Sequence, residues 1–122
     1  MNGNLLIDTN IFIYLTKGDQ KVIDYLQDRN ICISFISELE LLSFKGINEG
    51  EEQIIREILS QFTIIGFNGF LKETIINLRK KYNLKLPDSI ILAIAKQYDL
   101  PFLTSDKNLK NIEEIDVIIY EL

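Results

Sequence analysis

The chain contains no histidine. This absence excludes histidine general bases, Ser–His and Cys–His nucleophile pairs, and most zinc sites, because each of these requires an imidazole. Carboxylates, lysines and hydroxyls are the side chains that remain for any chemistry. The sequence therefore directs attention to its acidic residues.

Cysteine and long apolar runs are also scarce. Cys32 is the single cysteine. It lies between two isoleucines, which predicts a small core residue and excludes a disulfide framework. No apolar run approaches the ~20 residues that a membrane span needs. The N-terminus has no basic region followed by a long apolar one, so no secretory signal is indicated. We expect a soluble, cytoplasmic protein that does not contact a membrane.

Length and charge narrow the classes further. A chain of 122 residues with 47% hydrophobic residues predicts one domain, residues 1–122, with a sizeable core. The net charge of −5 argues against a protein that coats nucleic acid, although local contact with RNA stays open. Basic residues cluster in residues 79–85 and again at Lys107 and Lys110. They form either a positive rim around an acidic site or an ordinary solvated face.

Short apolar segments alternate with segments of helical periodicity. Strands are expected at residues 4–7, 31–34, 63–65, 102–104 and 117–120. Helices are expected from Ile11 to about Gly18, from Asp19 onward, and at 37–44, 49–62, 68–82 and 88–98. Asp8 or Thr9 would cap the first helix and Ser37 the third. Strands that are apolar on both faces and separated by helices predict a parallel sheet covered on two sides, an α/β sandwich.

Four acidic residues stand beside apolar runs that are expected to be buried: Asp8, Glu40, Asp88 and Asp106. A buried carboxylate without a partner is costly. Sites in parallel sheets form outside the carboxyl ends of the strands, so these side chains can converge at one edge. Their repulsion would then require a cation, and Mg²⁺ or Mn²⁺ suits hard oxygen ligands. A metal-dependent enzyme acting on phosphates is the first hypothesis.

Four motifs follow one another along the chain: Leu5-Leu6-Ile7-Asp8-Thr9-Asn10, Ser34-Phe35-Ile36-Ser37-Glu38-Leu39-Glu40-Leu41-Leu42, Leu86-Pro87-Asp88-Ser89-Ile90-Ile91-Leu92-Ala93, and Leu103-Thr104-Ser105-Asp106. In this order they resemble the PIN domain, and most closely the VapC-type toxins of bacterial toxin–antitoxin pairs. The resemblance covers nearly the whole chain. It implies a three-layer α/β/α sandwich with a parallel, five-stranded sheet, and Mg²⁺- or Mn²⁺-dependent endoribonuclease activity. It further implies an RNA substrate, a cognate antitoxin and a homodimer.

The resemblance matches Asp8, Glu40, Asp88 and Asp106 to the acidic positions of the family, and the chemistry of metal-assisted phosphodiester hydrolysis predicts their roles. Asp8 and Asp88 would be direct metal ligands, and Glu40 and Asp106 would bind the ion directly or through water. Polar residues would support these carboxylates: Asn10, Ser37, Ser89 and Thr104. Lys85 and Lys107 would hold flanking RNA phosphates.

Several alternatives stay open. Glu38 competes with Glu40, although the two face different directions on a helix and the apolar neighbours favour Glu40. Asp8 and Asp88 taken singly are equally well explained as helix caps. The chain would otherwise be a PIN nuclease of RNA processing, or a PIN module that binds RNA or protein without cleavage. The apolar residues of the first helix would suit either an antitoxin groove or the core.

Overall fold

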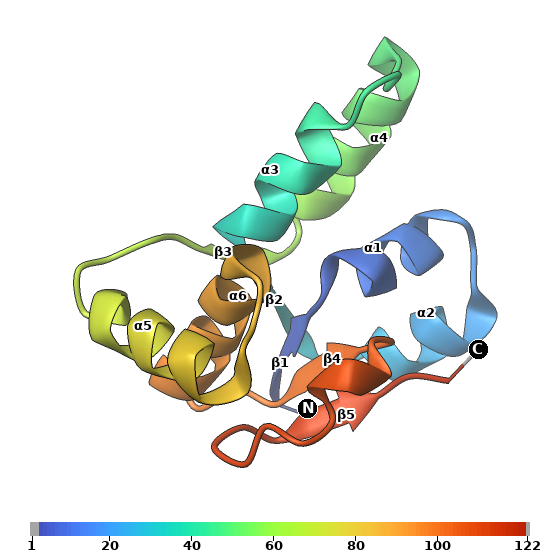
Figure 1. Ribbon diagram of the computed structural model, residues 1–122. Helices are drawn as coiled ribbons and strands as arrows, with labels where there is room; N and C mark the ends of the chain where they lie inside the picture. Colours follow the sequence, from blue (N-terminus) through green and yellow to red (C-terminus); the bar gives the residue numbers. More distant parts are fainter. Residues whose placement is uncertain (1–2, 122) are drawn as a thin grey trace.

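The computed structural model describes residues 3–121 of the chain. Its helices and strands alternate along the sequence (Figure 1). In chain order they are β1 (Asn4–Ile7), α1 (Thr9–Thr16), α2 (Gln20–Leu26), β2 (Asn30–Ser34), α3 (Phe35–Ser43), α4 (Glu49–Leu59), β3 (Thr63–Ile65), α5 (Leu71–Tyr82), α6 (Leu86–Gln97), β4 (Phe102–Thr104), the 3-10 helix η1 (Lys107–Leu109) and β5 (Val117–Ile119).

The five strands form one sheet in the order β3-β2-β1-β4-β5, and every paired neighbour is parallel. The chain runs from β1 outward through β2 to β3, and then returns to the other side of β1 to add β4 and β5. The strand order therefore reverses beside β1. Ligand sites of open parallel sheets form at such a reversal, outside the carboxyl ends of the strands.

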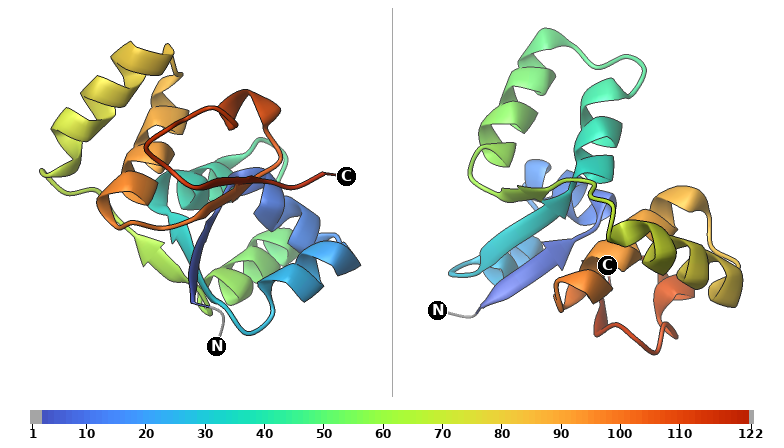
Figure 2. Two further views of the ribbon diagram at one scale, coloured as in Figure 1. Left: turned by 90° about the horizontal axis from the view of Figure 1, so that it is seen from below. Right: turned by 90° about the vertical axis from the view of Figure 1, so that its left-hand side faces the viewer.

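Alternating strand residues fill two separate cores, one on each face of the sheet. Leu6, Cys32 and Phe102 pack against α5 and α6. Ile7 and Ile33 instead face the side that carries α1 to α4. Figure 2 shows α5 and α6 on one side of the sheet and α1 and α2 on the other, while α3 and α4 form an antiparallel pair that projects beyond it. The expected three-layer α/β/α sandwich with a parallel, five-stranded sheet is confirmed.

The first residues of three helices differ from those predicted from the sequence. The cap of α3 is Ser34, whose hydroxyl accepts from the amide of Ile36, so Ser37 lies inside the helix instead of capping it. Helix α5 begins at Leu71, three residues later than expected. Helix α6 begins at Leu86 and includes Pro87 in its first turn, where proline is tolerated because the first amides of a helix have no intrahelical partner.

The caps of the first two helices agree with expectation. Asp8 caps α1 through the amide of Thr9, and Asp19 caps α2. A capping box at the start of α4 was not anticipated: the Asn48 side chain accepts from the amide of Glu51, and the Glu51 carboxylate accepts from the amide of Asn48. This reciprocal pair satisfies two amides that the helix leaves free.

Two apolar residues of α1 lie in the core. Ile11 and Phe12 are fully buried, so these two belong to the core and not to a partner groove. On α4, Ile54 is 54% exposed, whereas Ile55 and Leu59 are buried. The α1–α4 side of the molecule therefore combines a closed core with an exposed apolar margin.

Candidate active site

The four acidic residues singled out in the sequence line one hollow. This hollow has a volume of about 210 Å³ and lies at the carboxyl ends of β1 and β4. Helix α3 contacts both α1 and α6 beside it, and the N-terminal ends of these helices face the same region (Figure 1). Its lining residues are Asp8, Thr9, Asn10, Glu40, Pro87, Asp88, Ile91 and Asp106. Side chains separated by up to 98 positions in the sequence are thus brought to the point where the strand order reverses.

Asp8 is the most firmly held of the four carboxylates. The backbone amide of Thr9 donates to its Oδ1 at 2.8 Å, and the hydroxyl of Thr104 donates to its Oδ2 at 2.7 Å. The amide of Asp8 itself donates to the carbonyl of Leu103 at 3.0 Å. Asp8 therefore ties the end of β1 to the end of β4, and its two oxygens have fixed directions.

Burial and like charge act together on two of these acids. Burial raises the pKa of Asp8; hydrogen bonds from Thr104 and Thr9 oppose this rise in part, and repulsion from Glu40 and Asp106 adds to it. The Asp88 pKa is raised by burial first, and then by the charges of Asp8 and Asp106. Repulsion between groups requires proximity. The pKa values of Asp8 and Asp88 are therefore raised mainly by burial, and repulsion from neighbouring carboxylates adds to the rise.

Lys85 provides one counter-charge. It lies three residues before Asp88 on the segment that leads into α6, and its ammonium lowers the pKa of Asp88 against the larger effect of burial. Lys107 lies in η1 and is exposed. The structure therefore places Lys85 beside the acidic cluster, while the part of Lys107 in phosphate binding stays a prediction.

Thr9 links the ends of β1 and α3. Its hydroxyl lies 2.8 Å from Ser37 Oγ and 2.8 Å from Glu40 Oε1. One hydroxyl has a single hydrogen, and a charged carboxylate attracts it more strongly than a neutral hydroxyl does. Thr9 has donor geometry to both oxygens, so its hydrogen goes to the charged Glu40, with the fully buried Ser37 as the second acceptor beside it. The Thr9 hydroxyl therefore orients Glu40.

Glu40 differs from its sequence interpretation in one respect. It was expected to be half-buried among leucines, and it is exposed. Of its two neighbours on α3, Leu41 is buried in the core, whereas Leu39 is exposed. Glu38 is absent from the lining of the hollow, whereas Glu40 belongs to it. The geometry therefore favours Glu40 over Glu38.

Asp106 caps the short helix η1. Its Oδ1 accepts from the amide of Asn108 at 3.0 Å, and its own amide donates to Thr104 Oγ1 at 3.0 Å. Thr104 is fully buried and so joins the carboxylate of Asp8 to the backbone of Asp106. The expected supporting role of Thr104 agrees with these contacts.

The other residues predicted to support the carboxylates do not hydrogen-bond to them directly. Ser89 is fully buried, but its hydroxyl donates to the carbonyl of Leu86 at 2.6 Å. The expected bond from Ser89 to a carboxylate is therefore wrong, because the hydroxyl satisfies the first turn of α6 instead. Asn10 is exposed and lines the hollow. Ser37 reaches Glu40 only through Thr9.

The donor set of the hollow fits a divalent cation. The charged side chains that line it are all carboxylates, the ligands that Mg²⁺ and Mn²⁺ prefer. Within residues 3–121 no three acidic side chains come close enough to form a ready-made ligand cage. Mg²⁺ retains several waters and needs few direct carboxylates, so two close ligands with water-bridged neighbours are sufficient. Asp8 and Asp88, two partly buried acids with raised pKa, fit this role best.

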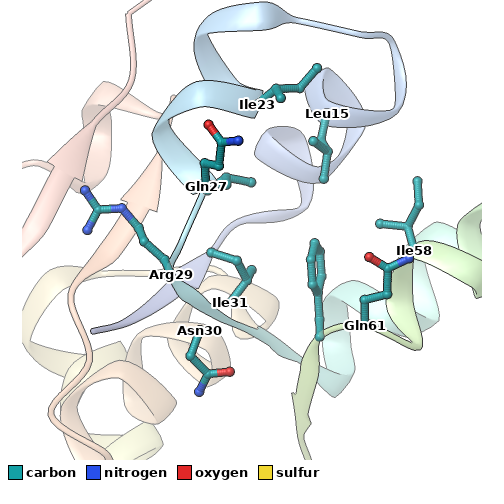
Figure 3. A pocket seen from close by; sticks show the side chains of 10 residues that line it. Leu15, Ile23, Gln27, Arg29, Asn30, Ile31, Ile58 and Gln61 are labelled. Carbon is teal, nitrogen blue, oxygen red and sulfur yellow. The ribbon is translucent and has the colours of Figure 1, made fainter. Parts of the chain in front are cut away.

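Two larger hollows have a different character. One, of about 390 Å³, lies at the amino-terminal end of β2, and its lining is mostly apolar, with Leu15, Ile31 and Ile58 among the side chains around it (Figure 3). The other, of about 510 Å³, is an apolar groove between α1, α3 and α4. Neither gathers carboxylates from several elements, so neither competes with the acidic hollow as a site for chemistry. None of the helices within residues 3–121 is both long enough and apolar enough to cross a membrane.

Comparison with known proteins agrees with this fold. The PIN domain family model matches residues 5–115. The chain belongs to the PIN domain family. A chain of a solved toxin–antitoxin complex from Klebsiella pneumoniae is 35% identical, with a TM-score of 0.84 and coverage of 97% of this chain and 99% of that chain. No match was found among curated proteins.

Two more distant structures share the fold. VapBC2 from Rickettsia felis, bound to a promoter DNA fragment, has a chain that is 21% identical, with a TM-score of 0.81 and coverage of 97% and 99% of the two chains. VapBC-1 from nontypeable Haemophilus influenzae has one that is 23% identical, with a TM-score of 0.78 and coverage of 95% and 97%. The resemblance to PIN domains of the VapC type is confirmed.

Two side-chain contacts of the site were not predicted from the sequence. Thr9 was interpreted as a cap, yet its side chain connects Ser37 with Glu40. Tyr14 was interpreted as a packing residue, yet its hydroxyl lies 3.3 Å from Ser105 Oγ, next to Asp106. The position of Thr9 directly after Asp8 was the available signal. No local signal connected Tyr14 with Ser105, because 91 positions separate them.

Proposed function

We propose that this protein is a Mg²⁺- or Mn²⁺-dependent endoribonuclease that hydrolyses RNA phosphodiester bonds at the acidic hollow. The observation that carries the proposal is the convergence of Asp8, Glu40, Asp88 and Asp106 at the strand reversal of a PIN fold. Because the chain has no histidine, we infer that its carboxylates act in phosphodiester hydrolysis by holding a divalent ion. A divalent ion supplies that chemistry by lowering the pKa of bound water and stabilising the charge on the leaving oxygen.

The side chains have separate tasks in this proposal. Asp8 and Asp88 hold the cation, and Thr104 fixes the direction of the Asp8 carboxylate through the bond to Oδ2. Glu40, oriented by Thr9, and Asp106, oriented by η1, hold and position water. Asp8, Glu40 and Asp106 are held by hydrogen bonds before substrate arrives, so little reorganisation of these three groups is needed during the reaction.

We further propose that the chain is the toxin of a type II toxin–antitoxin pair. The support is its 35% identity to a chain of the complex from Klebsiella pneumoniae over nearly the full length of both. The apolar groove between α1, α3 and α4, with Phe44 and Ile54 about half exposed, offers a surface for a cognate antitoxin. A cytoplasmic homodimer, with residues 1–122 acting as one nuclease domain, completes the proposal.

The test uses purified protein and a mixture of defined RNAs. We expect cleavage with Mg²⁺, its loss on addition of EDTA, and its return with excess Mg²⁺ or Mn²⁺. Asp8→Asn keeps an oxygen to cap α1 but removes a charged ligand, so cleavage should disappear while the thermal transition persists. Asp28→Asn is the matched control, because Asp28 is exposed with φ at 65°, a conformation that asparagine also adopts readily. An active Asp8→Asn variant would refute the site, and a chain that cleaves no RNA with metal present would favour a binding module.

The toxin role has its own test. Expression in bacteria should arrest growth, and Asp8→Asn should remove the arrest. Co-expression with the product of a short neighbouring reading frame should restore growth. A protein that cleaves RNA in vitro but never slows growth would instead be a nuclease of RNA processing.

A further inference from the structure

A basic segment of the chain leads directly to the acidic hollow. Residues 74–87 contain Arg79, Lys80, Lys81 and Lys85 and no acidic residue, although acids outnumber basic residues 18 to 13 in the whole chain. The four basic side chains are exposed. Positive charge is therefore concentrated in the segment that runs from the end of α5 to the start of α6, against an acidic background.

This segment is hollowed beside the end of α5. The hollow has a volume of about 390 Å³ and is lined by Ile76, Arg79, Lys80, Asn83 and Leu84. The Arg79 Nε donates to the carbonyl of Leu84 at 3.2 Å, which fixes the guanidinium at its edge. Ile76 is 43% exposed and provides an apolar surface within the same hollow. Cationic groups beside an apolar surface suit a phosphate–sugar backbone with its attached base.

The basic side chains are not used up by internal ion pairs. Within residues 3–121, the ion pairs join Arg56 to Glu52 and Lys81 to Glu114. Arg79 and Lys80 therefore have no carboxylate within bonding distance in that range. One cation in the last turn would suffice to complement the helix dipole. The remaining charge is available to a ligand outside the chain.

The spacing between the two hollows suits a short single strand. Asn83 lines the basic hollow and Asp88 lines the acidic one. Five residues of extended chain span at most about 18 Å. Lys85 lies between them in the sequence, is exposed, and directly precedes α6, whose first turn carries Asp88. A strand of a few nucleotides that leaves the acidic hollow along Lys85 would therefore reach Arg79 and Lys80.

We propose that Arg79 and Lys80 form a second phosphate-binding site, which holds single-stranded RNA a few nucleotides from the scissile bond. This inference rests on the proposed function, because it assigns the path of the substrate to the same acidic site. An acidic peptide is the competing ligand for a basic hollow. RNA is favoured because the segment that carries Arg79, Lys80 and Lys85 leads directly into the helix start that bears Asp88, at the site proposed to act on phosphates.

The test compares two double variants that remove the same charge. Arg79→Gln/Lys80→Gln removes two cations from the basic hollow. Lys17→Gln/Lys45→Gln removes two exposed cations on the opposite helical layer. The probe is a fluorescein-labelled single-stranded RNA of mixed sequence and about 20 nucleotides, long enough for most single-strand sites. Binding is followed by fluorescence anisotropy in EDTA over a range of salt concentrations, and thermal unfolding confirms that each variant is folded.

We expect the hollow variant to lower the slope of log Kd against log salt by about 1.4, since each lost phosphate contact on a single strand contributes about 0.7. Between 1 M and 0.1 M salt this corresponds to about 25-fold weaker binding at the lower concentration. The control variant should retain the wild-type slope. Equal slopes for the two variants, or no binding of RNA by the wild type, would overturn the proposal. Unchanged RNA binding with weakened binding of a poly-glutamate peptide would assign the hollow to an acidic peptide instead.

Cleavage of the same RNA with Mg²⁺ separates this inference from the proposed function. Wild-type protein that binds through Arg79 and Lys80 but never cleaves would refute the nuclease and leave the binding site. Wild-type protein that cleaves, with both double variants equally active and equally salt-dependent, would refute the binding site and leave the nuclease.

Discussion

Thr104→Val is the sharpest test of how the acidic hollow is held together. Thr104 is fully buried; its hydroxyl donates to Asp8 Oδ2 at 2.7 Å and accepts from the amide of Asp106 at 3.0 Å. Valine has nearly the same shape, so the substitution removes two hydrogen bonds and leaves no cavity. Its effect therefore measures polar contacts and not packing.

The expected loss of stability follows from these two contacts. A hydrogen bond to a charged group contributes about 1.5–3 kcal/mol, and an amide left without a partner costs about 1–3 kcal/mol. Asp106 is only partly buried, so water recovers part of the second term. We expect a decrease of about 2–4 kcal/mol in the free energy of unfolding, or roughly 10–15 °C in Tm for a chain of this size.

Thr104→Ser is the matched control. Serine keeps the hydroxyl and loses one buried methyl group, which costs about 1 kcal/mol. Urea unfolding in EDTA compares wild type and both variants without any contribution from a metal. If valine proves as stable as serine or the wild type, the hydroxyl does not support the carboxylate, and the account of the hollow given above fails.

The pH dependence adds a second requirement. The Thr104 bond lowers the pKa of Asp8, against a larger increase caused by burial. A bond that lowers the pKa of an acid stabilises its charged form, so its contribution is present at high pH and is lost as the pH falls through the pKa of Asp8. The stability gap between wild type and Thr104→Val should therefore narrow on acidification. A gap that stays constant with pH would show that the charge on Asp8 is not involved.

Three further results are expected. Thr9→Val should reduce cleavage severalfold by releasing Glu40 while Thr9→Ser restores it, and full activity of the valine variant would refute this role of Thr9. Glu40→Gln should reduce cleavage far more than Glu38→Gln, and equal rates would contradict the assignment. Burial raises the pKa of Asp8 and of Asp88 in the folded protein. Without metal, the contribution of these two groups to the free energy of unfolding should therefore fall as the pH rises from their pKa in the unfolded chain to their pKa in the folded protein. The gain in Tm on adding Mg²⁺ should accordingly grow over that pH range, and a gain independent of pH would exclude both acids as ligands.

The sheet was predictable because its strands are apolar on both faces. Residues such as Leu5, Leu6 and Ile33 leave no polar face, and a strand of that kind needs cover on two sides. Helix starts were less predictable. Ser34 and Ser37 are both good cap residues, and the choice between them depends on where β2 ends against its neighbours. That is a property of the sheet and not of the local sequence.

In the site, too, some features could be predicted from the local sequence and others depended on how distant elements pack. Asp8 could be identified because an acid directly follows an apolar strand. The bond between Thr9 and Glu40 could not be identified, because it depends on the relative placement of α1 and α3. Ser89 shows the opposite error: its position beside Asp88 suggested support for a carboxylate, yet its hydroxyl donates to the backbone carbonyl of Leu86 in the first turn of α6.

Capping and metal binding, which competed as explanations of these acids, are compatible in the structure. Asp8 uses Oδ1 to cap α1 and Asp106 uses Oδ1 to cap η1, while Asp88 lies in the first turn of α6. The positive end of a helix dipole stabilises a nearby carboxylate by about 0.3–1 kcal/mol. Three helix starts aimed at one hollow therefore offset part of the repulsion between the acids and hold them in place before a cation arrives. An acidic helix cap at the carboxyl end of a parallel strand therefore both stabilises its own charge and fixes the direction of a carboxylate that can bind a cation.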